Sequence, residues 1–321
     1  MRLKHLLSLL ILSLLLIGCG GKAESDLTRV NLPMGYVANV QFSPFYLAAE
    51  RGYFTEAGFD VNFDYRWETD GISLLAADAI PFAIASGDQV IQARSQGLPV
   101  VAVAAWYQRF PVAIVSLETL PLDSPTDLAG LRIGIPETFG ASYIGLRALL
   151  TEAGLTEADI DLRVIGYTQL AALTSESVDA VVVYTNNAPA ILEQEGIAYN
   201  ILYVADYANM VSAVLVTSDM QIERDPEQVR AFVGAFLHGL ADVLADPDAA
   251  FEISHRYIEG LAENAAAQRA VLEASIALWE APEPGRLNAD LWAEAQQVMF
   301  EAGLIQQTVP VETLFTNDFL P

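Results

Sequence analysis

Cysteine, histidine and basic residues are all scarce in this chain of 321 residues. It has one cysteine and three histidines, and its 16 lysines and arginines face 41 aspartates and glutamates, which gives a formal net charge of −25 at pH 7. A chain this acidic is a poor match for nucleic acid or for anionic lipid headgroups. A single cysteine also cannot pair within the chain, so no internal disulfide is expected. Disorder is excluded, because 53% of the residues are hydrophobic and only 18% are charged.

The sequence motifs of common enzyme classes are missing as well. There is no Gly-x-Ser-x-Gly elbow, no phosphate-binding loop and no spacing typical of metal ligands. His5 lies near the N-terminus, and His238 and His255 fall in segments that read as helices. Because no nucleophile lies beside a base, we expect a binding protein with no catalytic residues, no metal and no cofactor.

The first 18 residues have the pattern of an export signal. Arg2 and Lys4 precede an apolar run over 6–17, which is too short to span a bilayer comfortably. The run ends in Leu-Ile-Gly-Cys, which resembles the lipobox of bacterial lipoproteins and implies cleavage before Cys19 and its acylation, by palmitate for example. We therefore expect a lipoprotein signal peptide over 1–18 and a small, polar tether over 19–26. The mature protein would then be lipid-anchored on the extracytoplasmic face of the cell membrane.

Strand-like and helix-like segments alternate along the rest of the chain. Short apolar runs bounded by turn residues predict strands at 30–37, 61–65, 81–85, 100–105 and 111–116, and then at 131–135, 162–165, 180–184 and 213–217. Helices are predicted at 43–57, 88–96, 142–153 and 188–195, and from Pro226 onward the chain is mostly amphipathic helix. This alternation predicts an α/β fold with mainly parallel sheets and a C-terminal helical segment.

One αβ series interrupts another, which indicates a molecule of two lobes. We expect residues 27–116 and 213–321 to form lobe 1 and residues 117–212 to form lobe 2, with crossovers near 115–118 and 209–213. Ligands of open α/β sheets bind beyond the carboxyl ends of the strands. The strand ends of the two lobes should therefore line one cleft.

Aromatic and amide side chains gather at these predicted strand ends. Ten of them are predicted to contact a ligand: Asn39, Phe42, Trp67, Ser86, Gln89, Trp106, Tyr107, Phe139, Tyr184 and Asn187. Other polar or aromatic residues at the same ends are Gln41, Glu68, Asp88, Glu137, Thr138, Tyr143 and Asn186. Aromatic rings can stack on a flat heterocycle, and amides can both donate to and accept from its polar edge. The alternative is structural, since aromatic residues also pack in cores and serine or asparagine caps helices.

Residues 35–54, 57–61 and 178–180 resemble a known family, the substrate-binding proteins of ABC importers in the NMT1/THI5-like group. The resemblance implies a two-lobed, periplasmic-binding-protein-like (type II) fold with a hinge, and a ligand that is passed to a membrane permease. Residues 67–71, 86–89 and 105–109 are most similar to the riboflavin-binding branch of the group, with the branch that binds a thiamin pyrimidine precursor second. We expect a monomer that binds a small vitamin or vitamin precursor, with riboflavin favoured.

Two other classes remain open at this point. The fungal relatives of the group are pyrimidine-synthase enzymes that use a histidine and an iron-binding cysteine cluster, which this sequence lacks. The second alternative is a structural or sensory lipoprotein whose partner is another protein. Two αβ lobes with aromatic strand ends favour a small ligand over both.

Overall fold

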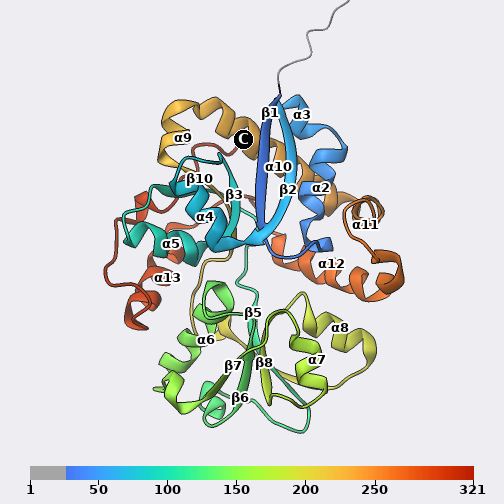
Figure 1. Ribbon diagram of the computed structural model, residues 1–321, viewed down its shortest axis with the longest axis vertical. Coiled ribbons are helices and arrows are strands. Elements are labelled where there is room, and N and C mark those ends of the chain that lie inside the picture. The colour runs from blue at the N-terminus through green and yellow to red at the C-terminus, as the bar shows by residue number, and fades with distance from the viewer. Residues whose placement is uncertain (1–26) are drawn as a thin grey trace, which may run out of the picture.

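The computed structural model of the chain describes residues 27–321, and it has two lobes joined by extended crossovers (Figure 1). The predicted signal peptide, tether and Cys19 lie outside the described residues. Lobe 1 contains the parallel pair β1 (Thr28–Gly35) and β2 (Phe59–Trp67). Beside it lies a three-stranded sheet of β3 (Ala83–Ser86), β10 (Ala213–Ser218) and β4 (Val100–Ala105), with β10 in the middle and antiparallel to both neighbours.

Lobe 2 is built on a five-stranded sheet in the order β7-β6-β8-β5-β9. Its strands are β5 (Val112–Leu117), β6 (Arg132–Ile135), β7 (Asp161–Val164), β8 (Ala180–Tyr184) and β9 (Tyr199–Tyr203). β6, β7 and β8 are parallel, and β5 runs antiparallel to β8 and β9. Helices α6 (Gly140–Glu152), α7 (Gln169–Thr174) and α8 (Ala188–Glu195) belong to this lobe. The apolar side chains of β5 and β8 are almost all buried, as is usual for strands covered on both faces.

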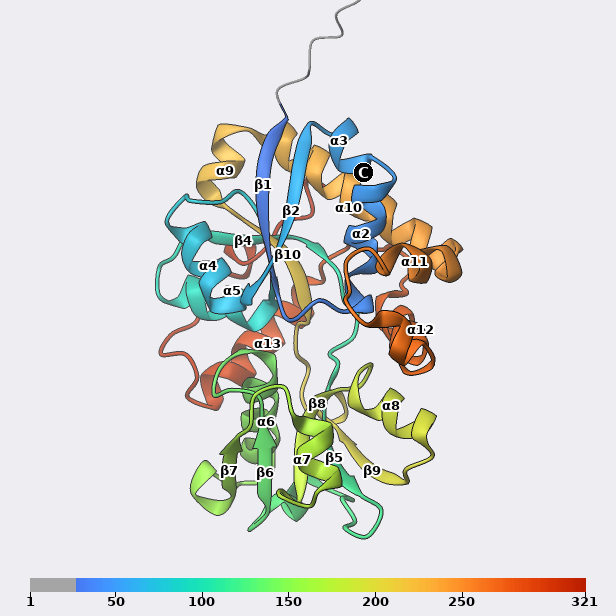
Figure 2. The ribbon, with the colours of Figure 1, turned by 45° about the vertical axis from the view of Figure 1, so that its right-hand side comes forward.

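Helices cover the sheets of lobe 1. They are α2 (Ser43–Glu50), α3 (Tyr53–Glu56), α4 (Glu68–Ala76), α5 (Gly87–Ser95), α9 (Asp219–Arg224), α10 (Pro226–Ala245), α11 (Pro247–Ser254), α12 (Ala265–Trp279) and α13 (Ala289–Glu301). The long helix α10 packs against α2, and Figure 2 shows both beside β1 and β2. The C-terminal helices also reach the other lobe, because α12 contacts α8 and α13 contacts α6.

One predicted lobe boundary is wrong. The sequence placed residues 111–116 in lobe 1, but β5 pairs with β8 and β9 in the sheet of lobe 2. The chain therefore enters lobe 2 between β4 and β5, and it returns to lobe 1 before β10 begins at Ala213. The physical reason for the error is that a fully apolar strand fits the interior of either sheet, so its pattern does not identify its partners.

Candidate ligand-binding site

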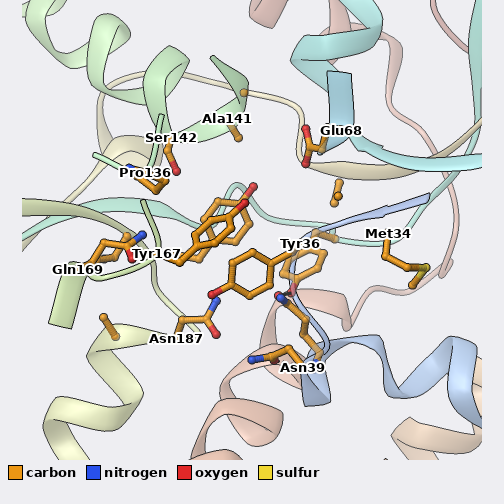
Figure 3. A pocket seen from close by; sticks show the side chains of 18 of the residues that line it. Met34, Tyr36, Asn39, Glu68, Pro136, Ala141, Ser142, Tyr167, Gln169 and Asn187 are labelled. Carbon is orange, nitrogen blue, oxygen red and sulfur yellow. Dashed lines mark hydrogen bonds between the residues drawn. The ribbon is translucent and has the colours of Figure 1, made fainter. Parts of the chain in front are cut away.

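A cavity of about 260 Å³ lies between the two lobes. Lobe 1 supplies the residues after β1 and β2 and at the end of β4, and lobe 2 supplies the residues after β6, β7 and β8. Figure 3 shows Tyr36 of lobe 1 and Tyr167 of lobe 2 side by side in this space. The carboxyl ends of strands from both lobes thus meet at one site.

Seven of the ten predicted contact residues line the cavity: Asn39, Phe42, Trp106, Tyr107, Phe139, Tyr184 and Asn187. Their arrangement follows from the local turns. Asn39 caps the short 3-10 helix Val40–Phe42 by accepting a hydrogen bond from the backbone N–H of Gln41. Phe139 and Asn187 directly precede α6 and α8. The structure places these seven residues around one cavity, and their contact with a ligand stays a prediction.

The other three predicted residues lie outside the cavity lining. Ser86 and Gln89 are buried behind the wall, where the Ser86 hydroxyl donates to Glu68 Oε2 (2.6 Å) and the Gln89 amide donates to Asp88 Oδ2 (3.1 Å). Trp67 lies at the surface with 39% of its area exposed. Its ring contacts Phe139 and Tyr167 of lobe 2, with centroid separations of 5.8 and 5.2 Å.

The aromatic wall has two parts with different roles. Trp106 stacks on Phe42 (5.3 Å) and on Trp279 (6.2 Å), so this ring belongs to a buried cluster of lobe 1 and is less available for stacking on a ligand. Tyr36 and Tyr167 meet edge to face across the cleft, with ring centroids 4.6 Å apart. Together with Tyr184 they are the rings best placed to contact a flat ligand.

A buried amide network forms the floor between the lobes. The Asn186 amide nitrogen of lobe 2 lies within hydrogen-bond distance of Ser275 Oγ (2.7 Å), Tyr107 Oη (3.1 Å) and Gln41 Oε1 (3.3 Å). The Tyr107 hydroxyl donates in turn to Gln41 Oε1 (2.8 Å). Burial raises the pKa of the Tyr107 hydroxyl, so it stays protonated and able to donate. This network fixes the distance between the lobes on one side of the cavity.

The remaining wall carries carboxyl groups. Glu68 of lobe 1 and Glu137 of lobe 2 both line the cavity, and Glu68 is visible at its upper edge in Figure 3. Burial and the nearby Asp88 raise the pKa of Glu68 from 4.5 to about 7, against the hydrogen bonds from Ser86. Burial and the charge of Glu68 raise the pKa of Glu137 from 4.5 to about 8. Near pH 7 both groups are therefore substantially protonated.

Positive charge is missing from this lining. In the part of the chain that the structure describes, no lysine, arginine or histidine lines the cavity. Residues 27–321 also hold no group of three histidine, cysteine or acidic side chains arranged to bind a metal ion. The site is thus suited to a neutral, flat, polar-edged molecule rather than to an anion.

Sequence reasoning did not nominate Tyr36, Tyr167, Gln169 or Gln268, although all four line the cavity. The same signal that identified the others was available for the first three. Tyr36 follows β1 directly, and Tyr167 and Gln169 follow β7. Gln268 has no such signal, because it lies on the tail helix α12 and reaches the cavity through tertiary packing.

Two lobes that enclose a cavity at their strand ends define a solute-binding protein. The chain belongs to the NMT1/THI5-like family, whose pattern matches residues 39–250. It is 40% identical to the riboflavin-binding protein RibY of Chloroflexus aurantiacus, over 93% of this chain and 88% of that protein. It is 32% identical to a formylaminopyrimidine-binding protein of Halalkalibacterium halodurans, over 77% of each chain.

The fold of this chain is also that of solved solute-binding proteins. The alkanesulfonate-binding protein SsuA of Xanthomonas axonopodis pv. citri superposes with a TM-score of 0.70 at 16% identity, over 91% of this chain and 99% of that one. The predicted α/β, periplasmic-binding-protein-like fold is therefore confirmed. The prediction of a binding protein rather than an enzyme is confirmed as well, because both relatives are binding proteins. In residues 27–321 no helix has the length and apolar character needed to cross a bilayer.

Proposed function

We propose that this protein captures riboflavin outside the cytoplasm and delivers it to an ABC permease. The observation that carries the proposal is the cavity between the lobes, in which tyrosine rings from both lobes meet edge to face and amides line the wall without a cationic side chain. A neutral isoalloxazine ring needs aromatic faces and a few donors and acceptors at its edge. The 40% identity to a riboflavin-binding protein supports the same ligand.

The proposal includes a lipid anchor at Cys19. Its support is the Leu-Ile-Gly-Cys sequence at residues 16–19, which would place acylation at the first residue of the mature chain. A tethered monomer would stay near its permease while its lobes open and close.

Titration of riboflavin into the purified mature domain tests the proposed ligand. Stacking against Tyr36, Tyr167 or Tyr184 should quench flavin fluorescence, and saturation should raise the melting temperature by mass action. The phosphorylated form, FMN, is the matched control. We expect it to bind at least tenfold more weakly, because its phosphate would enter a cavity lined by Glu68 and Glu137 without a compensating cation.

A formylaminopyrimidine is the second candidate, and the size of the cavity favours it. A volume of about 260 Å³ lies slightly below the roughly 300–1,000 Å³ of typical small-molecule sites, so the larger flavin requires the lobes to move apart somewhat. Calorimetry with both compounds separates the candidates. Tight binding of the pyrimidine together with no binding of riboflavin would assign the protein to the second ligand.

A further inference from the structure

Glu137 carries an acceptor atom that the protein leaves without a partner. It lies in the turn between β6 and α6 and lines the cavity. Its Oε2 is buried and has no hydrogen-bond partner in the described structure. Buried polar atoms are nearly always hydrogen-bonded, because an unsatisfied one costs about 1–3 kcal/mol. This atom is therefore positioned for a donor that comes from outside the protein.

The opposite lobe presents a second acceptor. Glu68, at the start of α4, uses Oε2 to accept from the backbone N–H and the hydroxyl of Ser86. Within the described part of the chain, these two bonds are the only hydrogen bonds of the Glu68 carboxylate. Its other oxygen, Oε1, therefore has no partner within residues 27–321. On α12, Gln268 adds another lining oxygen, Oε1, that is buried and unpartnered. Free acceptors thus converge on the cavity from both lobes.

We propose that Glu137 and Glu68 are specificity-determining residues that accept hydrogen bonds from O–H or N–H groups at one end of a neutral ligand. The inference rests on the proposed function and deepens it. In riboflavin the available donors are the ribityl hydroxyls and the imide N–H, and in a formylaminopyrimidine they are the amino and amide N–H groups. A donor held between carboxyls of opposite lobes would also link the lobes, so ligand recognition and closure would share the same bonds.

The test compares Glu137→Leu and Glu68→Leu, which remove both carboxyl oxygens, with Glu195→Leu, the same substitution at an exposed position at the end of α8. Dissociation constants are measured for riboflavin, for lumiflavin, which has the isoalloxazine ring with a methyl group in place of the ribityl chain, and for a formylaminopyrimidine. Thermal melts of the free proteins establish that each variant is folded. We expect Glu137→Leu and Glu68→Leu each to weaken ligand binding at least tenfold, because neither variant keeps an acceptor oxygen, with Glu195→Leu within twofold of wild type.

The pattern across ligands locates the donor. Weakened binding of riboflavin alone assigns the ribityl hydroxyls, and equally weakened binding of lumiflavin assigns the imide edge. If the wild type binds the pyrimidine and neither flavin, the proposed ligand is wrong, while the same variants still test the carboxyls on the pyrimidine. Unchanged affinity of folded Glu137→Leu and Glu68→Leu for whichever ligand the wild type binds would overturn the inference.

Discussion

Three carboxyl groups near the cavity lie in surroundings that oppose their ionisation. Burial raises the pKa of Asp88 to about 6, and burial together with a neighbouring carboxyl raises the pKa values of Glu68 and Glu137 to about 7 and about 8. The two glutamates come from different lobes, so closure of the lobes brings their carboxyl groups near each other. In residues 27–321 no basic side chain lines the cavity to offset their charge. The closed form is therefore most compatible with protonated glutamates.

This arrangement predicts that the closed form loses stability as the pH rises. Because the folded pKa of Glu137 lies above its ordinary 4.5, its stabilising contribution is fully present below pH 4.5 and is lost as the pH rises through about 8. Asp88 and Glu68 titrate in the same direction at lower pH, and Tyr36, Tyr167 and Tyr184 have raised pKa values and stay neutral below pH 10. Between pH 6 and 9 we expect the melting temperature of the wild type to fall about 2–4 °C more than that of Glu137→Gln.

Glu195→Gln provides the control for the change in net charge, since Glu195 is exposed and lies at the far end of α8. The melting temperature of Glu195→Gln should follow that of the wild type from pH 6 to 9. Parallel melting curves for wild type and Glu137→Gln from pH 6 to 9 would contradict a titrating, buried Glu137.

At the scale of elements, the contact between α10 and α2 depends on the absence of a side chain. A Cβ on Gly239 would come within 2.1 Å of the Pro44 carbonyl oxygen and 3.1 Å of the Ala48 backbone nitrogen. These are backbone atoms, which cannot move aside without shifting α2. Gly234 lies on the same helix with no atom within 4 Å of the corresponding position.

Substitution of the two glycines by alanine should change the free energy of unfolding in opposite directions. Gly239→Ala forces the helices apart, and we expect it to lower the free energy of unfolding by about 1–3 kcal/mol. Gly234→Ala should raise it by about 0.5–1 kcal/mol, because alanine has the higher helix propensity and reduces the freedom of the unfolded chain. Urea denaturation of both variants measures the difference. Tolerance of Gly239→Ala would show that α10 and α2 do not approach this closely, and destabilisation by Gly234→Ala would show that the space beside Gly234 is not open.

Most strands could be predicted because they are short apolar runs bounded by turns. The prediction at 100–105 coincides with β4, and those at 30–37 and 61–65 overlap β1 and β2. Strand β9 and helix α7 were not predicted, since β9 is only partly buried and α7 has six residues, too few to show a period. The helix predicted over 43–57 is divided into α2 and α3 at Gly52, whose φ of +80° interrupts the helical conformation.

The same reasoning explains which site residues could be found. Strand ends in an α/β fold mark the cleft, so Asn39, Phe139 and Tyr184 could be placed near it from the sequence. Trp67 is the last residue of β2, yet its side chain lies outside the cavity, while the next residue, Glu68, lines it. Ser86 and Gln89 follow β3 but their side chains bond to Glu68 and Asp88. Which side chain faces a cavity depends on tertiary packing that no single segment encodes.

At the scale of the whole molecule, the lobes meet where α12 packs on α8 and α13 on α6, and two further sets of contacts lie beside the cavity. Asn186 connects lobe 2 to Gln41, Tyr107 and Ser275 at the buried side of the cavity. At the surface side, Trp67 of lobe 1 lies against Phe139 and Tyr167 of lobe 2. The first set is buried and polar, so water cannot readily replace it. The second is partly exposed and aromatic, which makes it the easier one to open.

We therefore expect Trp67 to control how fast a ligand leaves. Trp67→Ala removes two aromatic contacts between the lobes, each worth about 0.5–1.5 kcal/mol, but changes no residue that lines the cavity. Dissociation should accelerate about tenfold, with a smaller effect on association, because the contacts form only as the lobes close. Stopped-flow flavin fluorescence measures both rates, and Phe300→Ala, at an exposed position on α13, is the control. Small-angle scattering at saturating ligand should show that the variant still becomes more compact on binding. If Trp67→Ala and Phe300→Ala release ligand at the same rate, the contacts of Trp67 with lobe 2 do not control ligand release.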